Sequence, residues 1–509
     1  MVSIPLTSGA YSSQSLIANA QRCVNLYPEK NPEDTKPAMP VTHYPRPGLR
    51  FLSTPPVGGV SRCLYGATNG DLYAIIGQQV YYIDPDFVFH TLGSLLAGST
   101  TPAYIADNGS QAIVVDGSPQ GYIITFAKGG NPRTFAQIAD PNFPGSTRAD
   151  FIDSFLVLNV PGTNQWYSTQ SDMITPFNPL YIGVKTAWPD NVLCVVTSER
   201  QVWVLGPKKA EIWFNAGAVP FPFQILQGNI IEQGCAAVYS PAKIGQNLYW
   251  LSQSPEGDRM VVKVDSQNIA QRVSTHAIEA EWRSYARIDD AVGATYQISG
   301  HSFYKLTFPT ADKTWGYDEA TNQWHEDNKI DANGVFHRAH NTFCAFAYGK
   351  NLALDWDHGA LLQIDPAATS GDVGVSTNPV VWIRSFPHIL NELKYVSYSA
   401  FSADVATGTS VGTGETTQFL SPWSSGFSAG FGPVTPVAAP QLCMRMSRDG
   451  GYTFGNGRIK TLVGSGNYRT MQRFRGNGIA RDAVFELSST AQMIGALNGA
   501  YIDPIPASS

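Results

Sequence analysis

The stretch with the clearest chemical pattern is SRDGGYTF at residues 447–454. Seven of its eight positions fit the aspartate-box pattern Ser-x-Asp-x-Gly-x-Thr-Trp, with Phe454 in place of the Trp. In such a turn the Asp carboxylate accepts hydrogen bonds from amides of its own hairpin, and the Gly takes a φ that other residues resist. The pattern therefore predicts a structural turn formed by Ser447, Asp449, Gly451, Thr453 and Phe454.

The same box recurs in sialidases and other propeller glycosidases, so sugar cleavage is a rival interpretation. Cleavage needs two carboxylates beside a pocket, one as the acid and the other as nucleophile or base. With 40 acidic residues, the chain offers candidates such as Glu199, Glu211, Glu279, Asp355 and Asp357. Sialidases repeat the box on several blades, whereas this sequence has one copy, outside the predicted propeller. We therefore predict a structural turn and no catalytic residues.

Three histidines are the candidates for a metal site: His337, His340 and His358. Two histidines spaced i, i+3 share a face on a helix, but this region is predicted to be strand. The nucleotide-binding loop GxxxxGK[ST] and the zinc motif HExxH are absent from the sequence. We predict turn and surface histidines, and neither a metal nor a cofactor.

Length and composition favour an all-β protein of two or three domains. The chain has 509 residues, with 47 Gly, 34 Pro and 12% aromatic residues, which suits short strands joined by tight turns. The net charge is −6. A negative net charge argues against a protein that binds nucleic acid tightly, and it is compatible with a surface along which DNA moves without binding. We expect no membrane span and no secretory signal, free cysteines rather than disulfides, and folding in the cytoplasm.

Residues 59–370 are predicted to form a β-propeller of six or seven blades. Within 64–84, apolar runs are separated by an Asn-Gly turn at 69–70, and similar units recur about every 40 residues. A four-stranded blade needs about that length. Helix is scarce; the best candidate is 273–286, with Ser274 or Thr275 as its N-cap.

The two ends of the chain differ in composition from the predicted propeller. Residues 1–58 are rich in proline and are predicted to be an extended arm that lies on its own domain or on a neighbouring subunit. Residues 371–509 are predicted to be a second all-β domain, similar to a β-sandwich, with a Gly/Ser/Thr-rich insertion at 404–440. The insertion is either a flexible segment or a projecting loop that docks on a partner through Phe419, Trp423, Phe427 and Phe431.

A basic strand near the C-terminus is a candidate interface. Alternation places Arg469, Arg473 and Arg475 on one face. Residues 441–490 contain eight Lys or Arg and three acidic residues, so this segment carries +5 and the rest of the −6 chain carries −11. The face is either simply solvated or contacts an acidic neighbour, such as another copy of the chain.

A series of stretches in fixed order, from residue 19 to about 504, resembles one known family. They are NAQRCVNLYPEKNPE, YPRPGL, WVLGPKKAEIWFNAG, GNIIEQGC, NLYWLSQSPEGDRMV, VSTHAIE, GHSFYKLTFP, TWGYDEATNQWHE and the segment 447–487. Together they are similar to the packaged-DNA stabilisation, or head-completion, proteins of short-tailed bacteriophages, the tail hub or tail nozzle family. The insertion at 404–440 has no counterpart in this resemblance.

The resemblance implies a non-enzymatic protein of the virion tail that assembles as a homo-hexameric ring below the portal and its adaptor. Such a ring retains the packaged DNA, carries tail spikes or fibres and a needle or plug, and becomes the channel for genome ejection. Genomic DNA would pass through the lumen without sequence-specific binding. Two rival functions stay open: a propeller glycosidase or lyase acting on host surface glycans, and a lectin-like propeller that binds them. Both predict a pocket at the mouth of the blades.

Overall fold

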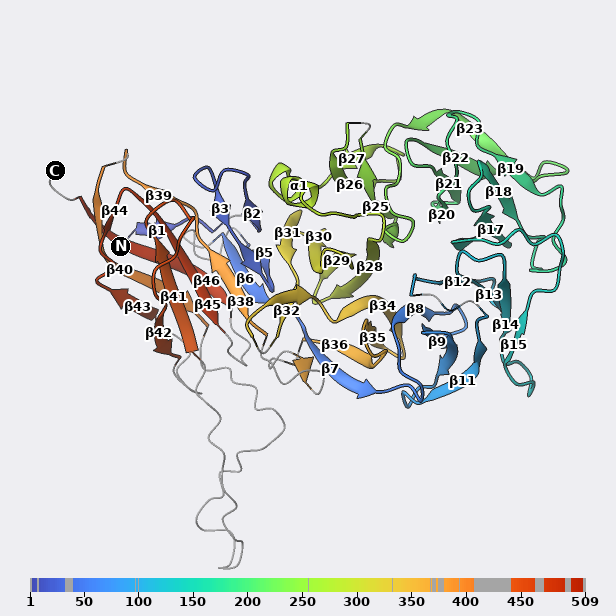
Figure 1. Cartoon of the computed structure of the whole chain (residues 1–509), viewed down its shortest axis with the longest axis horizontal. Coiled ribbons are helices and arrows are strands. Elements are labelled where there is room, and N and C mark those ends of the chain that lie inside the picture. The colour runs from blue at the N-terminus through green and yellow to red at the C-terminus, as the bar shows by residue number, and fades with distance from the viewer. Residues whose placement is uncertain are drawn as a thin grey trace, which may run out of the picture. The chain divides into compact units, whose positions relative to one another are not determined.

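The computed structural model shows a chain that is almost entirely β (Figure 1). It describes residues 2–6, 9–32, 40–96, 98, 100–254, 256–331, 333–366, 368, 372–373, 380–392, 394–406, 441–462, 471–489 and 496–506. Two compact units are distinguished. The propeller unit comprises Phe51–Asn328 and His337–Ile364, and the sandwich unit comprises Met1–Arg50, Lys329–Phe336 and Asp365–Ser509.

Six blades of the propeller unit each contain four consecutive antiparallel strands; five of these blades are separate four-stranded sheets, and the sixth is part of a ten-stranded sheet. The first three sheets contain β8 (Ser61–Gly66), β9 (Leu72–Ile76), β10 (Gln79–Ile83), β11 (Phe89–Ser94); β12 (Tyr104–Asp107), β13 (Gln111–Val115), β14 (Gly121–Thr125), β15 (Thr134–Gln137); and β16 (Ala149–Ile152), β17 (Phe155–Asn159), β18 (Gln165–Ser168), β19 (Ile182–Val184). The next three contain β20 (Cys194–Ser198), β21 (Gln201–Leu205), β22 (Ala210–Asn215), β23 (Phe223–Ile231); β24 (Ala242–Ile244), β25 (Asn247–Gln253), β26 (Arg259–Val264), β27 (Ala270–Arg272); and β28 (Val292–Ile298), β29 (His301–Phe308), β30 (Lys313–Asp318), β31 (Gln323–Glu326).

A seventh sheet completes the ring. It contains β34 (Asn341–Ala347), β35 (Lys350–Asp355) and β36 (Leu361–Asp365), followed by β7 (Gly48–Ser53) from the opposite end of the chain. Figure 1 shows the sheets arranged around a common centre, with first strands such as β8, β12, β28 and β34 nearest to it. The prediction of an all-β fold with a propeller of six or seven blades is confirmed.

Each blade is buried on both faces because it lies between two neighbours. Along β9, Tyr73 and Ile75 pack against the following sheet, whereas Leu72, Ala74 and Ile76 pack against the seventh sheet. All five side chains are buried. Burial of each large apolar side chain contributes about 1.5–3 kcal/mol, so the near-continuous apolar run of a central blade strand follows directly from its position.

The turns and the helix follow the sequence signals. The Asn-Gly turn joins β8 to β9, and Gly70 has a φ of 91°. Helix α1 (His276–Arg283) lies on the connection between β27 and β28 and is capped by Thr275, whose side chain accepts a hydrogen bond from the amide of Ile278. Two further short strands, β32 (Asn328–Ile330) and β33 (Phe336–Arg338), pair with each other.

The sandwich unit has two facing sheets. One follows the order β43-β40-β46-β6-β5, with β1 beside β46 and β44 beside β40, and the other contains β4-β38-β45-β41-β42, with β39 beside β45. Aromatic rings join them: Phe401 stacks on Phe485 at 4.8 Å between centroids, and Phe386 meets Phe401 at 5.3 Å. The strand bounds are β1 (Val2–Ile4), β2 (Tyr11–Ser12), β3 (Ala20–Gln21), β4 (Cys23–Val24), β5 (Leu26–Lys30), β6 (Val41–Pro45), β37 (Asp372–Val373), β38 (Trp382–Ser385), β39 (Ile389–Leu390), β40 (Val396–Val405), β41 (Gln441–Ser447), β42 (Arg458–Thr461), β43 (Met471–Arg475), β44 (Ile479–Ala480), β45 (Asp482–Ser489) and β46 (Leu497–Pro506). The C-terminal strands form this sandwich together with strands from residues 1–50.

The N-terminal segment, predicted as an extended arm over 1–58, lies on its own chain, because its residues up to Arg50 belong to the sandwich unit. Strand β4 pairs with β38, and β6 pairs with both β5 and β46. Two prolines are accommodated within these strands. Pro28 lies in β5, which ends the strand order of its sheet, and Pro45 is the last residue of β6, so their missing amides interrupt no central ladder.

A buried arginine fastens this segment to the C-terminal strands. The side chain of Arg384 on β38 donates from Nη2 to Gln21 Oε1 at 2.9 Å, and from Nη1 to the carbonyls of Arg22 at 3.2 Å and Gly9 at 3.4 Å. Its guanidinium is completely buried, and this burial lowers the pKa of Arg384. The hydrogen bonds offset the desolvation of the charge.

We predict that Arg384→Met releases the N-terminal segment. Three acceptors, two of them on buried residues, would lose a charged donor, which costs about 3 kcal/mol or more. Urea unfolding of the full chain measures the loss of stability, and limited proteolysis followed by mass spectrometry shows new cleavage within residues 9–22. The matched control is Arg481→Met, because Arg481 is exposed. An unchanged cleavage pattern in Arg384→Met would contradict this role.

Candidate functional site

The centre of the propeller unit contains a cavity of about 340 Å³. Its walls come from the first strands of several blades and from the segments that precede them. Polar groups on the wall include Tyr65, Tyr104, Arg148, Tyr239 and Lys243. A water molecule occupies about 30 Å³ of liquid, so the cavity has room for a small ligand or about ten waters.

Arg148 connects blades that are not neighbours in the ring. It precedes β16, and its Nη2 donates to Tyr104 Oη on β12 at 2.8 Å and to the Pro241 carbonyl at 2.9 Å. Its Nη1 donates to the Val238 carbonyl at 3.3 Å, and the guanidinium lies 4.4 Å from the centroid of the Tyr104 ring. The side chain thus joins the second and third blades to the segment that precedes the fifth.

A second charged group lies beside Arg148. Lys243 Nζ is 2.7 Å from Asp150 Oδ2 and donates to Thr197 Oγ1 at 3.1 Å, and the Thr197 amide donates to Asp150 Oδ2 at 2.9 Å. Burial alone would raise the pKa of Asp150, but Lys243 and these hydrogen bonds lower it below the usual value. Asp150 is therefore an ionised partner of Lys243 and is unsuited to act as a general acid.

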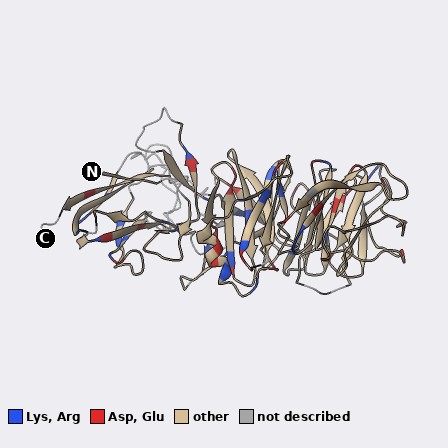
Figure 2. Ribbon diagram, turned by 90° about the horizontal axis from the view of Figure 1, so that it is seen from above, with Lys and Arg blue, Asp and Glu red and all other residues tan. Residues whose placement is uncertain are grey.

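Other buried charges join neighbouring blades in the same way. Arg62 on β8 lies 3.3 Å from Asp116, and Lys305 on β29 lies 2.9 Å from Asp327 and donates to Asn341 Oδ1 at 2.8 Å. Figure 2 shows basic and acidic residues interspersed along the strands. Buried opposite charges that hydrogen-bond to each other hold the blades in register, because a lone charge there would be costly.

The two thiols that line the cavity are unsuited to nucleophilic chemistry. None of the six cysteines, all of which lie in the described ranges, forms a disulfide. Burial raises the pKa of the Cys63 thiol to about 12 and that of Cys344 to about 11, and both line the cavity. A thiol with such a pKa is protonated at neutral pH, whereas the thiolate is the nucleophile.

The five carboxylates considered for sugar cleavage lie on separate elements. Glu211 is on β22, Glu279 on α1, Glu199 in the turn after β20, and Asp355 and Asp357 at the end of β35 and just beyond it. Glu211 accepts hydrogen bonds from the Thr186 amide at 2.8 Å and from Trp213 Nε1 at 3.2 Å. Glu279 forms an ion pair with Arg272. These partners hold Glu211 and Glu279 in structural roles.

The three histidines considered as metal ligands each lie near a carboxylate. His337 Nδ1 is 2.6 Å from Asp312 Oδ2, and His340 Nδ1 is 3.1 Å from Asp355 Oδ1. His358 is largely exposed. Within the described ranges, no group of three or more His, Cys, Asp or Glu side chains is arranged to hold a metal ion.

The aspartate-box turn lies in the sandwich unit between β41 and β42. The Thr453 amide donates to Asp449 Oδ1 at 2.9 Å, the Thr453 hydroxyl donates to Asp449 Oδ2 at 2.5 Å, and Ser447 Oγ donates to Asp449 Oδ1 at 2.6 Å. Gly451 has a φ of 96°, and its amide donates to Ser447 Oγ at 2.8 Å. Phe454 bridges back to Ser447, so these contacts close the hairpin.

Hydrogen bonds within this turn lower the pKa of Asp449. Desolvation raises the pKa of Asp449, but the hydrogen bonds from Ser447 and Thr453 outweigh it and bring the pKa down to about 2. Because the folded-state pKa lies below that of the unfolded chain, the stabilisation is present above about pH 4 and is lost as the pH falls towards 2.

The predicted interface residues fall into two groups. Arg469, Phe419, Trp423, Phe427 and Phe431 lie outside the described residues, which resume at Gln441 and at Met471. Along β43, Met471 and Arg475 are exposed, Gln472 and Phe474 are buried, and Arg473 forms an ion pair with Asp503. Arg475 is thus the exposed arginine of this strand, and its contact with a neighbour stays a prediction.

Comparison with known proteins identifies the family. The family model described as "Bacteriophage P22 Gp10, beta-propeller" matches residues 2–367, which is more than two thirds of the 509 residues. The chain belongs to this family. It is a bacteriophage structural protein with a β-propeller and a component of the virion. Among curated proteins, none matches this sequence.

Similar solved structures are distant in sequence. The extracellular domain of the putative one component system BT4673 from B. thetaiotaomicron is 9% identical with a TM-score of 0.42, and the match covers 62% of this chain and 39% of that one. Virginiamycin B lyase from Staphylococcus aureus is 9% identical, with a TM-score of 0.38 and coverage of 62% and 98%. The N-terminal domain of Nup159 is 10% identical, with a TM-score of 0.37 and coverage of 67% and 98%. These likenesses transfer no activity to the Gp10-family chain.

The Gp10-family chain also has features that the sequence interpretation missed. Arg148 and Asp150 were not singled out, although TRADF at 147–151 places two charges in a strand that is otherwise mostly apolar. That local contrast was the available signal for a buried charged group. In the described part of the chain, no helix has the length and apolar character needed to cross a membrane.

We predict that Arg148→Met destabilises the propeller unit by about 3 kcal/mol, because two main-chain carbonyls and a tyrosine hydroxyl lose a buried donor. Urea unfolding followed by tryptophan fluorescence measures this loss. Arg200→Met is the control, because the side chain of Arg200 is 82% exposed. Equal midpoints for both variants would show that Arg148 does not connect the blades.

We predict that Asp449→Asn lowers the melting temperature of the sandwich unit at neutral pH, since the charged acceptor of Thr453 is lost. The difference from the unsubstituted protein should shrink as the pH falls from about 4 to about 2, where Asp449 becomes protonated. Calorimetry at a series of pH values measures it, with Glu256→Gln as an exposed control. A difference that is constant across this range would rule out the charge as the source.

Proposed function

We propose that this phage structural protein forms the tail hub or nozzle, a homo-hexameric ring below the portal and adaptor. The ring retains the packaged DNA, anchors tail spikes or fibres and the needle or plug, and serves as the channel for genome ejection. The observation that carries the proposal is the match of residues 2–367 to the Gp10 family. The protein acts through its interfaces and not through catalysis.

The geometry of the propeller supports a ring made of several copies. A cavity of about 340 Å³, crossed by the hydrogen bonds of Arg148, is far too small to pass a DNA duplex. A genome passage must therefore be enclosed between copies and not run along the axis of one propeller. The negative net charge of −6 limits the sticking of phosphates to such a passage.

The described groups also support a non-catalytic role. The cavity thiols are protonated at neutral pH, and Asp150 is paired with Lys243. Glu211 and Glu279 are engaged by Trp213 and Arg272. Cleavage of a glycan requires two carboxylates that face one sugar.

We expect the purified chain to form a hexamer by native mass spectrometry and negative-stain microscopy, either alone or after addition of the adaptor protein that templates it. Gel analysis of purified virions should detect the polypeptide. A chain that remains monomeric with its adaptor, or virions that lack it, would overturn the proposal. Turnover of a host saccharide by purified protein would overturn its non-catalytic part.

We predict that removal of residues 407–440 yields particles that package DNA but lack a tail component. The deletion spares β40, which ends at Val405, and β41, which begins at Gln441. Gel analysis of purified particles and plaque counts measure the effect. The control replaces 407–440 with a Gly/Ser segment of equal length, which keeps the spacing but removes the aromatic residues and should give the same loss. Full infectivity of both variants would contradict a docking role.

A further inference from the structure

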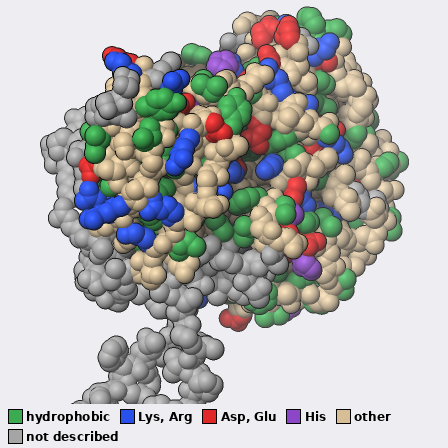
Figure 3. All heavy atoms as spheres, turned by 60° about the vertical axis from the view of Figure 1, so that its left-hand side comes forward, with side chains coloured by type: hydrophobic (Ala, Val, Ile, Leu, Met, Phe, Trp, Pro, Cys, Tyr) green, Lys and Arg blue, Asp and Glu red, His purple; other side chains and the backbone are tan. Residues whose placement is uncertain are grey.

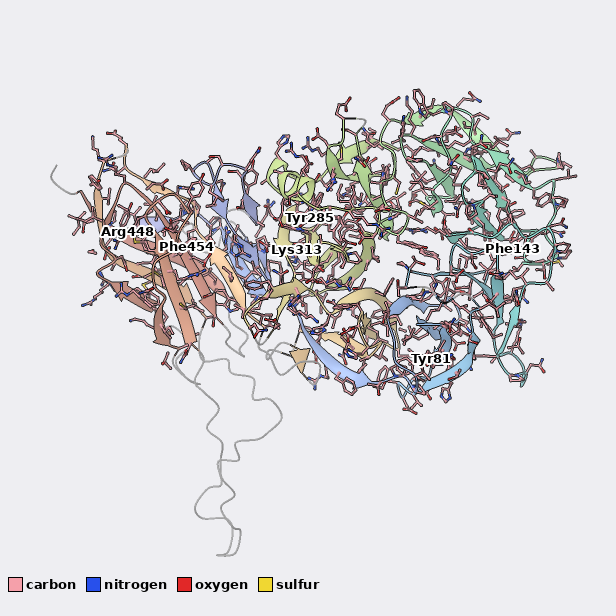
Figure 4. All side chains as sticks on the ribbon, in the orientation of Figure 1. Tyr81, Phe143, Tyr285, Lys313, Arg448 and Phe454 are labelled. Atoms are coloured by element: carbon pink, nitrogen blue, oxygen red, sulfur yellow. The ribbon has the colours of Figure 1, made fainter. Side chains whose placement is uncertain are left out.

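A second pocket lies in the sandwich unit beside the aspartate-box turn. Its volume is about 370 Å³, and its lining includes Arg448, Arg458, Phe454, Met444 and Met446. Figure 4 labels Arg448 and Phe454, which lie near each other on this unit. Figure 3 shows Lys and Arg side chains gathered on the side that is turned forward. The pocket combines two guanidinium groups with an apolar wall.

The two guanidinium groups are held in place by one residue. Arg448 Nη2 donates to the Asn477 carbonyl at 3.2 Å, and Arg458 Nη1 donates to Asn477 Oδ1 at 2.8 Å. Asn477 is buried, and its side-chain amide donates to the Phe474 carbonyl at 3.1 Å. At Gly478, with a φ of 85°, a Cβ atom would lie 2.5 Å from Arg448 Nη2. The hydrogen bonds to Asn477 orient both cations in advance of any ligand.

Three other arginines of the same unit form ion pairs. Arg445 pairs with Glu486, Arg473 with Asp503, and Arg50 with Asp365. Among the residues that the structure describes, Arg448 and Arg458 form no ion pair; the acceptors of their hydrogen bonds are neutral oxygens. Two like charges that contact one residue repel each other. An anion bound between them would remove this repulsion and form charge-assisted hydrogen bonds.

The apolar wall indicates what carries the anion. Phe454 and two methionines line the pocket, and the guanidinium of Arg445 lies 5.2 Å from the centroid of the Phe454 ring. This wall suits the methylene groups of an acidic side chain. A carboxylate on a short aliphatic stem therefore fits both parts of the pocket.

We propose that this pocket binds an acidic side chain of a second copy of the chain, and so forms part of the contact between neighbouring subunits of the ring. The charge distribution favours that occupant, because residues 441–490 carry +5 and the rest of the chain carries −11. The identity of the occupant depends on the proposed ring, whereas the affinity of the pocket for carboxylates does not.

Binding of a fluorescein-labelled hexaglutamate peptide to the full-length chain tests the pocket itself. Arg448→Gln combined with Arg458→Gln should weaken binding at least about tenfold in fluorescence anisotropy. The control, Lys460→Gln combined with Arg481→Gln, removes the same charge outside the pocket and should change affinity less than about threefold. The affinities are compared after the melting temperatures of both variants are shown to be equal. Arg448→Lys combined with Arg458→Lys serves as the variant that keeps both charges. Equal weakening by the pocket and control variants would overturn the proposal.

Sedimentation velocity of the same variants, with adaptor where it is needed, tests the occupant. The pocket variant should dissociate at higher protein concentration than the control. If the unsubstituted chain forms a ring and the pocket variant forms it equally well, the pocket proposal fails while the ring stands. If no ring forms at all, the proposed function fails, and with it the second copy as occupant. Binding of a 20-base-pair DNA duplex that is lost only in the pocket variant would identify phosphate as the ligand and overturn the proposal.

Discussion

The structure of the propeller depends on covering both faces of every sheet. Strand β9 carries apolar side chains on both faces, with Tyr73 and Ile75 on one and Leu72 and Ile76 on the other. A sheet built from such strands is stable only between two neighbouring sheets. The sheets must therefore close into a ring, and the last of them is completed by β7 from the opposite end of the chain. Closure removes the exposed apolar face that an open stack would leave at each end.

Ring closure brings charged groups from several blades into a small interior, where each must find a partner. Arg148 reaches Tyr104 and two main-chain carbonyls, Lys243 reaches Asp150, and Arg62 reaches Asp116. Groups that are fully engaged in this way stabilise the fold and have little capacity left for chemistry.

In the sandwich unit, the groups that are available to bind a ligand lie outside the core. Its core is a stack of aromatic rings around Phe401 and Phe485, and buried Arg384 joins the N-terminal segment to β38. The aspartate-box turn is closed by its own hydrogen bonds and leaves Arg448 and Arg458 beside a pocket. The turn therefore places two cations, which have no ion-pair partner among the described residues, beside an apolar wall.

The sequence determined the local structure, because turns, strand alternation and caps depend on neighbouring residues. The Asn-Gly turn at 69–70, the blade repeat, the Thr275 cap and the bonds of Asp449 all follow from short-range patterns. Only the tertiary structure decided contacts between residues far apart in the chain. These include the place of β7 beside β36 in the seventh sheet, the inclusion of residues 1–50 in the sandwich unit, and the meeting of Arg148 with Val238 and Pro241. The same is true of the pocket, since Asn477 holds arginines that lie 19 and 29 positions earlier. Spacing along the chain carries no signal for such pairs, because packing of whole sheets, and not local preference, brings them together.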